Sequence, residues 1–150
     1  MLRANRSKTR VRGQGLAEFA IVLPVLMLIL GGIIQFGVIF WGQNTLNQVV
    51  RDTGRYAASV LVDPTTCDTT ANRNDVIARA NAIAGSSSFV GSVTGVTVTW
   101  SGSPCPPTKN TEVAWVQIQM TAQVPVFFVW VPGNGSIGSS TEFRMEPRNP

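Results

Sequence analysis

The stretch Gly13–Gly42, GQGLAEFAIVLPVLMLILGGIIQFGVIFWG, decides how this chain is organised. Its part from Phe19 to Gly42 carries no charged residue, and Gln35 is the one strongly polar side chain in it. As a helix rising about 1.5 Å per residue, residues 19–42 would measure about 36 Å, enough to cross a hydrocarbon layer of about 30 Å with some tilt. We therefore predict a membrane-spanning helix over residues 19–42.

A short basic tail precedes this run. Its cations are Arg3, Arg6, Lys8, Arg10 and Arg12, with no acid among them. Such a tail stays in the cytoplasm, so the segment after the membrane is exported. A cleaved secretory signal is the alternative, but its apolar region would be about 7–15 residues long and followed by small residues at a cleavage site. The longer run here, with no A-x-A after Gly42, favours a retained single-pass anchor.

The chain has a net charge of +4, and the tail accounts for it, because the remaining residues together are almost neutral. A nucleic-acid-binding domain would spread its cations over a folded face. We therefore expect no nucleic-acid partner.

Beyond the membrane the pattern predicts an α+β fold. Residues 43–62 continue the long helix as an exported extension with an apolar stripe, and Asp63-Pro64 ends it. A second helix is expected from about Thr70 to Ile83, with Gly85 as its stop. Residues 63–150 thus form a small head domain.

The rest of the head shows the period-two alternation of an antiparallel sheet. Strands are expected from Val93 to Trp100, from Glu112 to Val124 and from Thr141 to Glu146, with a turn at residues 133–135. Pro125 interrupts the second strand. The apolar run after it packs in the core, forms an edge strand, or exposes a patch that contacts another subunit or the membrane surface. The candidate contact residues are Phe127, Phe128 and Trp130.

Cys67 and Cys105 are the only two cysteines, and both lie in the exported part. An even count in a small exported domain predicts a disulfide bond between them, although two unrelated buried thiols remain an alternative. Two cysteines without any histidine make a poor zinc site.

The residues of common catalytic sites are missing from the sequence. There is no histidine, no phosphate-binding loop and no G-x-G-x-x-G motif. We expect no enzymatic activity, no cofactor and no metal.

Several short motifs in the first 58 residues, taken together, resemble the TadE family of pseudopilins, minor pilin-like proteins of the Tad (Flp-type) tight-adherence pilus. The matching pieces, in order, are Arg12-Gly13-Gln14, Ala17-Glu18-Phe19-Ala20, Val22-Leu23-Pro24, Phe36-Gly37 and Arg51-Asp52-Thr53-Gly54-Arg55-Tyr56-Ala57-Ala58. Each motif alone is a weak indication of the family, but all of them in this order are a specific one. The head matches only in general pattern.

The resemblance implies that residues 1–13 are a leader, cut by a prepilin peptidase between Gly13 and Gln14, and that residues 14–62 are the long helix. Glu18, followed by Phe19, would then pair with the new amino terminus of a neighbouring subunit, since an acid and an ammonium each lower the cost of burying the other. Pro24 would kink or loosen the helix, although proline is also ordinary in membrane helices.

The implied partners are the prepilin peptidase, other pilin or pseudopilin subunits, the inner-membrane assembly platform and the lipid bilayer. The implied location is the bacterial inner membrane, with the amino terminus cytoplasmic and the head outside the cytoplasm, before any incorporation into a pilus. A competing hypothesis is an unprocessed, single-pass anchored module whose exported head binds a ligand or a surface.

Overall fold

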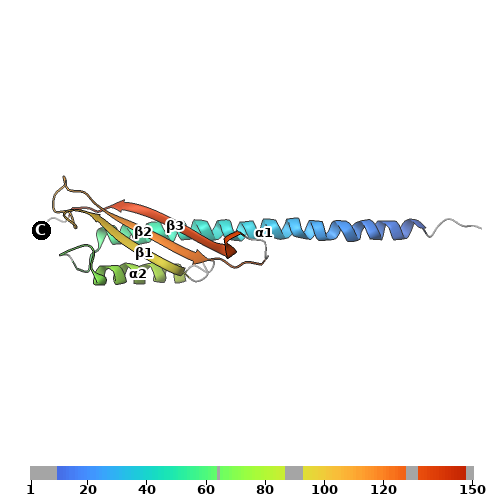
Figure 1. Cartoon of the computed structure of the whole chain (residues 1–150), viewed down its shortest axis with the longest axis horizontal. Coiled ribbons are helices and arrows are strands. Elements are labelled where there is room, and N and C mark those ends of the chain that lie inside the picture. Colours follow the sequence, from blue (N-terminus) through green and yellow to red (C-terminus); the bar gives the residue numbers. More distant parts are fainter. Residues whose placement is uncertain (1–9, 64, 87–92, 128–131, 148–150) are drawn as a thin grey trace, which may run out of the picture.

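The computed structural model describes residues 10–63, 65–86, 93–127 and 132–147 of the chain. Its elements, in order, are the helices α1 (Arg10–Ser59) and α2 (Thr70–Gly85), the strands β1 (Val93–Gly102) and β2 (Ala114–Gln123), a short 3-10 turn η1 (Pro132–Gly135), and the strand β3 (Ser136–Arg144). Figure 1 shows that the second helix and the sheet gather around the C-terminal part of α1, while its N-terminal part projects alone. The predicted α+β arrangement is confirmed.

The long helix begins and ends at residues different from those predicted. It already includes residues 10–13, which belong to the expected leader, and it stops at Ser59 rather than Val62. The last turn closes with the Val60 N–H donating to the Tyr56 carbonyl at 2.8 Å. Leaving the helix there lets Leu61 turn into the core, whereas Val60 stays exposed.

Pro24 lies inside α1 without interrupting it. Figure 1 shows no sharp bend along the projecting part. A kink at Pro24 therefore stays a prediction for the helix in a bilayer or an assembly.

The sheet is antiparallel, with the strand order β1-β2-β3. Its register places Val98 opposite Ile118, and Ile118 opposite Thr141. The third strand is longer than predicted and lies earlier, because pairing with β2 begins at Ser136, directly after the turn. Gly133, Asn134 and Gly135 all have positive φ, which glycine and asparagine tolerate best, and this explains the turn at residues 133–135.

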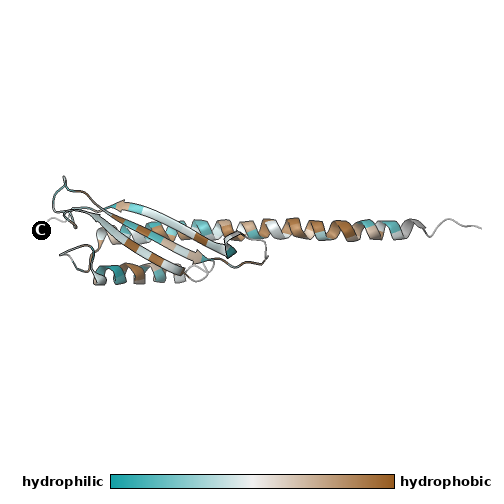
Figure 2. Ribbon diagram, in the orientation of Figure 1, coloured by the Kyte–Doolittle hydropathy of each residue, from teal (hydrophilic) through white to brown (hydrophobic). Residues whose placement is uncertain are grey.

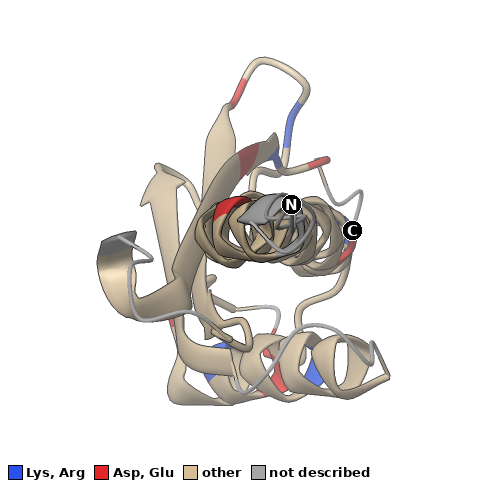
Figure 3. Cartoon of the chain, turned by 90° about the vertical axis from the view of Figure 1, so that its right-hand side faces the viewer, with Lys and Arg blue, Asp and Glu red and all other residues tan. Residues whose placement is uncertain are grey.

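One face of the sheet packs against the two helices and forms the core. Helix α1 contacts β2 and β3, whereas α2 contacts β1 and α1. The end-on view in Figure 3 shows the strands curving around one side of α1, with α2 beneath. The buried apolar side chains come from every layer: Leu46, Val49, Val50, Ala57, Val76, Ala80, Ala84, Val98, Trp100, Val116, Ile118, Met120, Ala122 and Ile137.

Two glycines of α1 allow the sheet to approach the helix closely. A Cβ atom at Gly42 would lie close to the Val124 side chain, and one at Gly54 would overlap the Phe143 ring. These positions touch opposite ends of the sheet, so they set how closely the sheet packs along the helix. By contrast, a Cβ at Gly32 or Gly37 would meet nothing within 4 Å.

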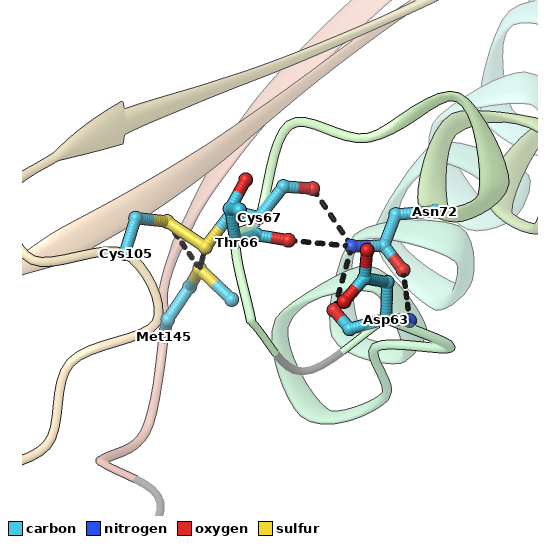
Figure 4. Close-up of a disulfide and its surroundings, with 6 residues drawn as sticks. All are labelled: Asp63, Thr66, Cys67, Asn72, Cys105 and Met145. Carbon is cyan, nitrogen blue, oxygen red and sulfur yellow. Dashed lines mark hydrogen bonds between the residues drawn. A yellow bond between two sulfur atoms is a disulfide. The ribbon is translucent and has the colours of Figure 1, made fainter.

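The end of the head farthest from the projecting helix is held by a disulfide bond and a buried asparagine (Figure 4). Cys67 and Cys105 are bonded, with their Cα atoms 5.4 Å apart, and the Met145 sulfur lies 3.7 Å from each of their sulfur atoms. Asn72, at the start of α2, is buried beside them. The head is thus cross-linked at its distal end, where the loops after α1 and β1 meet.

Asn72 organises the loop between the two helices. Its Nδ2 donates to the carbonyl oxygens of Asp63, Thr66 and Cys67 at 2.8–3.1 Å, and its Oδ1 accepts from the Asp63 N–H at 2.8 Å. The Asn72 N–H in turn donates to Oγ1 of Thr69, the N-cap residue of α2, at 3.2 Å. One side chain therefore bonds four backbone groups of the loop that carries Cys67.

Candidate functional site: the projecting part of α1

The N-terminal part of α1 exposes large apolar side chains around its whole circumference. Leu16, Ile21, Val25, Leu28 and Ile33 are all more than half exposed. In the part of the chain that the structure describes, α1 is the one helix long and apolar enough to cross a membrane. Figure 2 shows this projecting segment as an almost continuous apolar cylinder. Such a surface needs lipid or other apolar helices around it.

Glu18 is the charged residue at the edge of this cylinder. It is exposed, and its Oε1 accepts a hydrogen bond of 3.2 Å from Nε2 of Gln14, one helical turn earlier. Phe19 is exposed beside it. In the single chain, the carboxylate is therefore met only by a neutral side chain among the described residues.

Gly13 and Gln14, the predicted processing residues, lie within the first turns of α1. A Cβ at Gly13 or Gly15 would meet nothing within 4 Å. The bond between Gly13 and Gln14 is therefore unshielded, but it is held in a helix.

Gln35 occupies a position whose role the sequence did not reveal. Its side chain is only 3% exposed although it lies in the apolar run. Its Nε2 donates to the Pro125 carbonyl at 3.2 Å, and its Oε1 accepts from the Phe127 N–H at 2.8 Å. The side-chain amide thus bonds both ends of a short backbone segment, as a peptide group does in a sheet. The only signal was that Gln35 is the lone strongly polar residue of the run.

The predicted contact patch is described in part. Phe127 is 65% exposed, so it is not a core residue. Phe128 and Trp130 lie outside the described residues. The Gln35 bonds show that the segment containing Phe127 lies beside α1, well below the end of the predicted span at Gly42.

The second half of α1 is tied to α2 by Tyr56. Its hydroxyl donates to Oδ2 of Asp75 at 2.7 Å, and the guanidinium of Arg79 lies 5.6 Å from the centre of its ring. The hydrogen bond to Asp75 raises the pKa of the Tyr56 hydroxyl above its ordinary value of 10.0, because it stabilises the protonated form. Arg51, Asp52 and Arg55, on the same half of α1, are exposed.

Three carboxylates stabilise the distal loops, of which Asp68 is exposed and Asp63 and Glu112 are partly exposed. Asp63 accepts hydrogen bonds from the hydroxyl and N–H of Thr65, Glu112 accepts from the N–H and hydroxyl of Thr108, and Asp68 pairs with Arg73 at 2.6 Å. Each set of donors holds the pKa of its carboxyl below the ordinary value, since the donors favour the ionised form. These groups shape loops, and they lie far from the projecting helix.

The described residues contain no cluster of three or more histidine, cysteine or acidic side chains suited to a metal ion. The arrangement of α1 is that of an interaction surface: an apolar helix, one acid at its edge and a head fastened to its other half.

Residues 13–55 match the family model described as TadE-like protein. The match lies entirely within α1 and confirms, over this segment, the resemblance that its motifs indicated. No curated protein and no solved structure matches the chain.

Proposed function

We propose that the chain is a minor pilin or pseudopilin of a Tad (Flp-type) pilus, needed for the initiation or assembly of the filament. It is made as a single-pass precursor in the bacterial inner membrane, with its head outside the cytoplasm. Its partners are the prepilin peptidase, other pilin-like subunits, the assembly platform and the bilayer. Its role is structural, and it is a substrate of the peptidase rather than an enzyme.

The observation that carries the proposal is the projecting part of α1, with Glu18 at its apolar edge, inside the segment that matches the TadE-like model. A helix exposing apolar side chains all round suits two environments, the lipid of a membrane and the helical core of a filament. The same surface therefore serves the precursor and the assembled subunit.

The two glycines flanking Gln14 support processing at this point. A peptidase must draw the scissile backbone into its own site, and a helix resists this. Each glycine weakens a helix by about 1 kcal/mol relative to alanine. Gly13 and Gly15 therefore make the first turns of α1 easy to unwind around the Gly13–Gln14 bond.

Cleavage after Gly13 would supply Glu18 with a cationic partner. The new ammonium of Gln14 in a neighbouring subunit can displace the weak bond that Glu18 now accepts from its own Gln14 side chain. In an apolar surrounding, such a pair fixes the axial register between two helices as well as neutralising both charges.

Intact-mass spectrometry of the protein purified from cells with an active prepilin peptidase tests the proposal. The expected mass is that of a chain beginning at Gln14. In a Gly13→Leu variant, the bulky residue before the scissile bond should leave the leader attached. An intact leader in the unchanged protein would instead favour the unprocessed anchored module.

A further inference from the structure

We propose that the segment Pro125–Phe127 of the head is embedded in the outer leaflet of the lipid bilayer beside α1, so that the precursor is held in the membrane by a loop as well as by its helix. This inference rests on the proposed function only in requiring α1 to span a membrane.

The depth of the segment follows from the Gln35 hydrogen bonds. Gln35 lies six residues before Trp41 on the same helix, which is about 9 Å along its axis. Trp41 is exposed near the end of the apolar run, where aromatic rings settle at the membrane surface. Because Gln35 bonds directly to Pro125 and Phe127, the segment lies deeper than Trp41, at the level of the hydrocarbon.

The exposed side chains at this level are apolar on both the helix and the loop. Phe36 is 71% exposed and Phe40 is 74% exposed on α1, and Phe127 is similarly exposed on the loop. Rings this exposed would be unfavourable in water, and burying each in lipid is favourable. A shared lipid environment accounts for the exposure of all three rings.

The polar groups are arranged as a bilayer requires. Non-helical backbone is tolerated at membrane depth only where its N–H and C=O groups are satisfied within the protein. The amide of Gln35 bonds the carbonyl of Pro125 and the N–H of Phe127, and these bonds equally satisfy the one strongly polar side chain of the run. Pro125 itself has no N–H to satisfy.

The charge distribution agrees with this placement. No Asp, Glu, Lys or Arg occurs in residues 19–50, 80–108 or 113–141. These stretches include the end of α2, the start of β1 and the end of β2. Figure 1 shows all three at the end of the head that faces the projecting helix. The head thus turns an uncharged end toward the membrane and keeps its charged groups away from it.

Spin-label depth measurements test the inference on the full chain in vesicles of phosphatidylethanolamine and phosphatidylglycerol. With the native disulfide intact, a single label is placed at Phe127→Cys, at Ile29→Cys in the middle of α1, or at Lys109→Cys in a distal loop. Collision rates with oxygen, which concentrates in lipid, are compared with those of a water-soluble nickel reagent.

We expect the oxygen-to-nickel ratio at residue 127 to be several-fold higher than at residue 109 and to approach that at residue 29. A ratio at 127 equal to that at 109 would overturn the inference, as would low collision rates with both reagents, which would indicate cover by a second protein. A water-like label at residue 29 would overturn the spanning helix as well, and with it the proposed function.

A second pair of variants tests the role of Gln35. Gln35→Leu, combined with the label at residue 127, removes both bonds to the segment, so the ratio at 127 should fall toward that of water. Gln43→Leu is the matched control, since Gln43 is also a helix glutamine bonded to the head, with its Nε2 2.8 Å from the Gly138 carbonyl. It should leave the ratio at 127 unchanged, and an equal fall in both variants would count against the assigned depth.

Discussion

Glu18 is the side chain on which the assembly proposal turns. Placing an ionised acid in the middle of a membrane costs about 3 kcal/mol on insertion scales, and the cost diminishes toward the edge. Among the residues that the structure describes, the neutral side chain of Gln14 is the hydrogen-bond donor to this carboxylate. A partner charge from a neighbouring chain would lower the cost and would exist only after cleavage.

We predict that Glu18→Ala leaves cleavage after Gly13 intact but impairs incorporation into the pilus. The substitution removes the charge that pairs with the new amino terminus while leaving the scissile bond in place. Intact mass reports the cleavage, and the yield of sheared pili reports the assembly. Glu142→Ala, an exposed acid on β3, is the control and should change neither. Normal assembly by the Glu18 variant would contradict the pairing.

Asn72 illustrates how one buried polar side chain determines a loop. Replacing it by alanine leaves three carbonyl groups and one N–H without their present partner. Each such group costs about 1–3 kcal/mol when it stays buried, and less where water reaches it. We predict that Asn72→Ala lowers the free energy of unfolding of the head by about 2–3 kcal/mol, measured by urea denaturation in detergent with tryptophan fluorescence. The exposed Asn74→Ala on the same helix should change it by less than about 0.5 kcal/mol.

At the scale of elements, the fit of α1 against the sheet is set by glycine positions. We predict that Gly54→Ala lowers the free energy of unfolding by about 1–3 kcal/mol, because the new methyl overlaps the Phe143 ring. Gly37→Ala meets open space and should be neutral or slightly stabilising, since alanine favours a helix by about 1 kcal/mol over glycine. The same urea titration measures both, and equal stability of the two variants would show that the helix does not sit as close as described.

Most elements were predictable because their signal is local. The hydrophobic run and the strict alternation of β2 each belong to a single stretch of chain, and the structure shows a helix and a strand there. The end of α1 was predicted three residues too late, because Asp63-Pro64 was taken as the stop whereas the helix ends before it, with Leu61 buried although it is not helical. Periodicity alone does not show whether a buried side chain at this position belongs to the helix or to the segment that follows it.

The polar contacts could not be predicted in the same way. Gln35 bonds to residues about 90 positions later in the chain, and the sequence shows only that it is unusual. Asn72 could be placed near the start of α2, but its partners depend on how the preceding loop folds back. Glu18 was found from its local motif, and the partner proposed for it belongs to a neighbouring chain.

At the scale of the whole molecule, the head has opposite ends with different chemistry. Its distal end carries the disulfide and the loops held by Asp63, Asp68 and Glu112. A carboxyl with a depressed pKa stabilises the fold above its unfolded pKa, and this contribution is lost as the pH falls through the folded pKa. The ordinary values are 3.8 for Asp and 4.5 for Glu.

We therefore predict that the head is progressively destabilised as the pH is lowered from about 5 to below about 3. The three carboxyls are exposed or partly exposed, so the change should be modest, and it should shrink further at high salt for the Asp68–Arg73 pair. Urea midpoints measured between pH 3 and pH 7 give the dependence. A variant with Asp63→Asn, Asp68→Asn and Glu112→Gln should lose most of it, and an unchanged slope would show that other groups titrate.

The lengthwise packing of the sheet has a mechanical consequence. Figure 1 shows the strands lying along α1 rather than across it, and contacts with the sheet extend from Gly42 to Gly54. A filament under tension would pull each subunit along the axis of its helix. Such a force acts parallel to the interface between the helix and the sheet, so it would load all of these contacts at the same time rather than one after another. The disulfide limits how far the two loops at the far end can separate. Such a head should yield slowly to force.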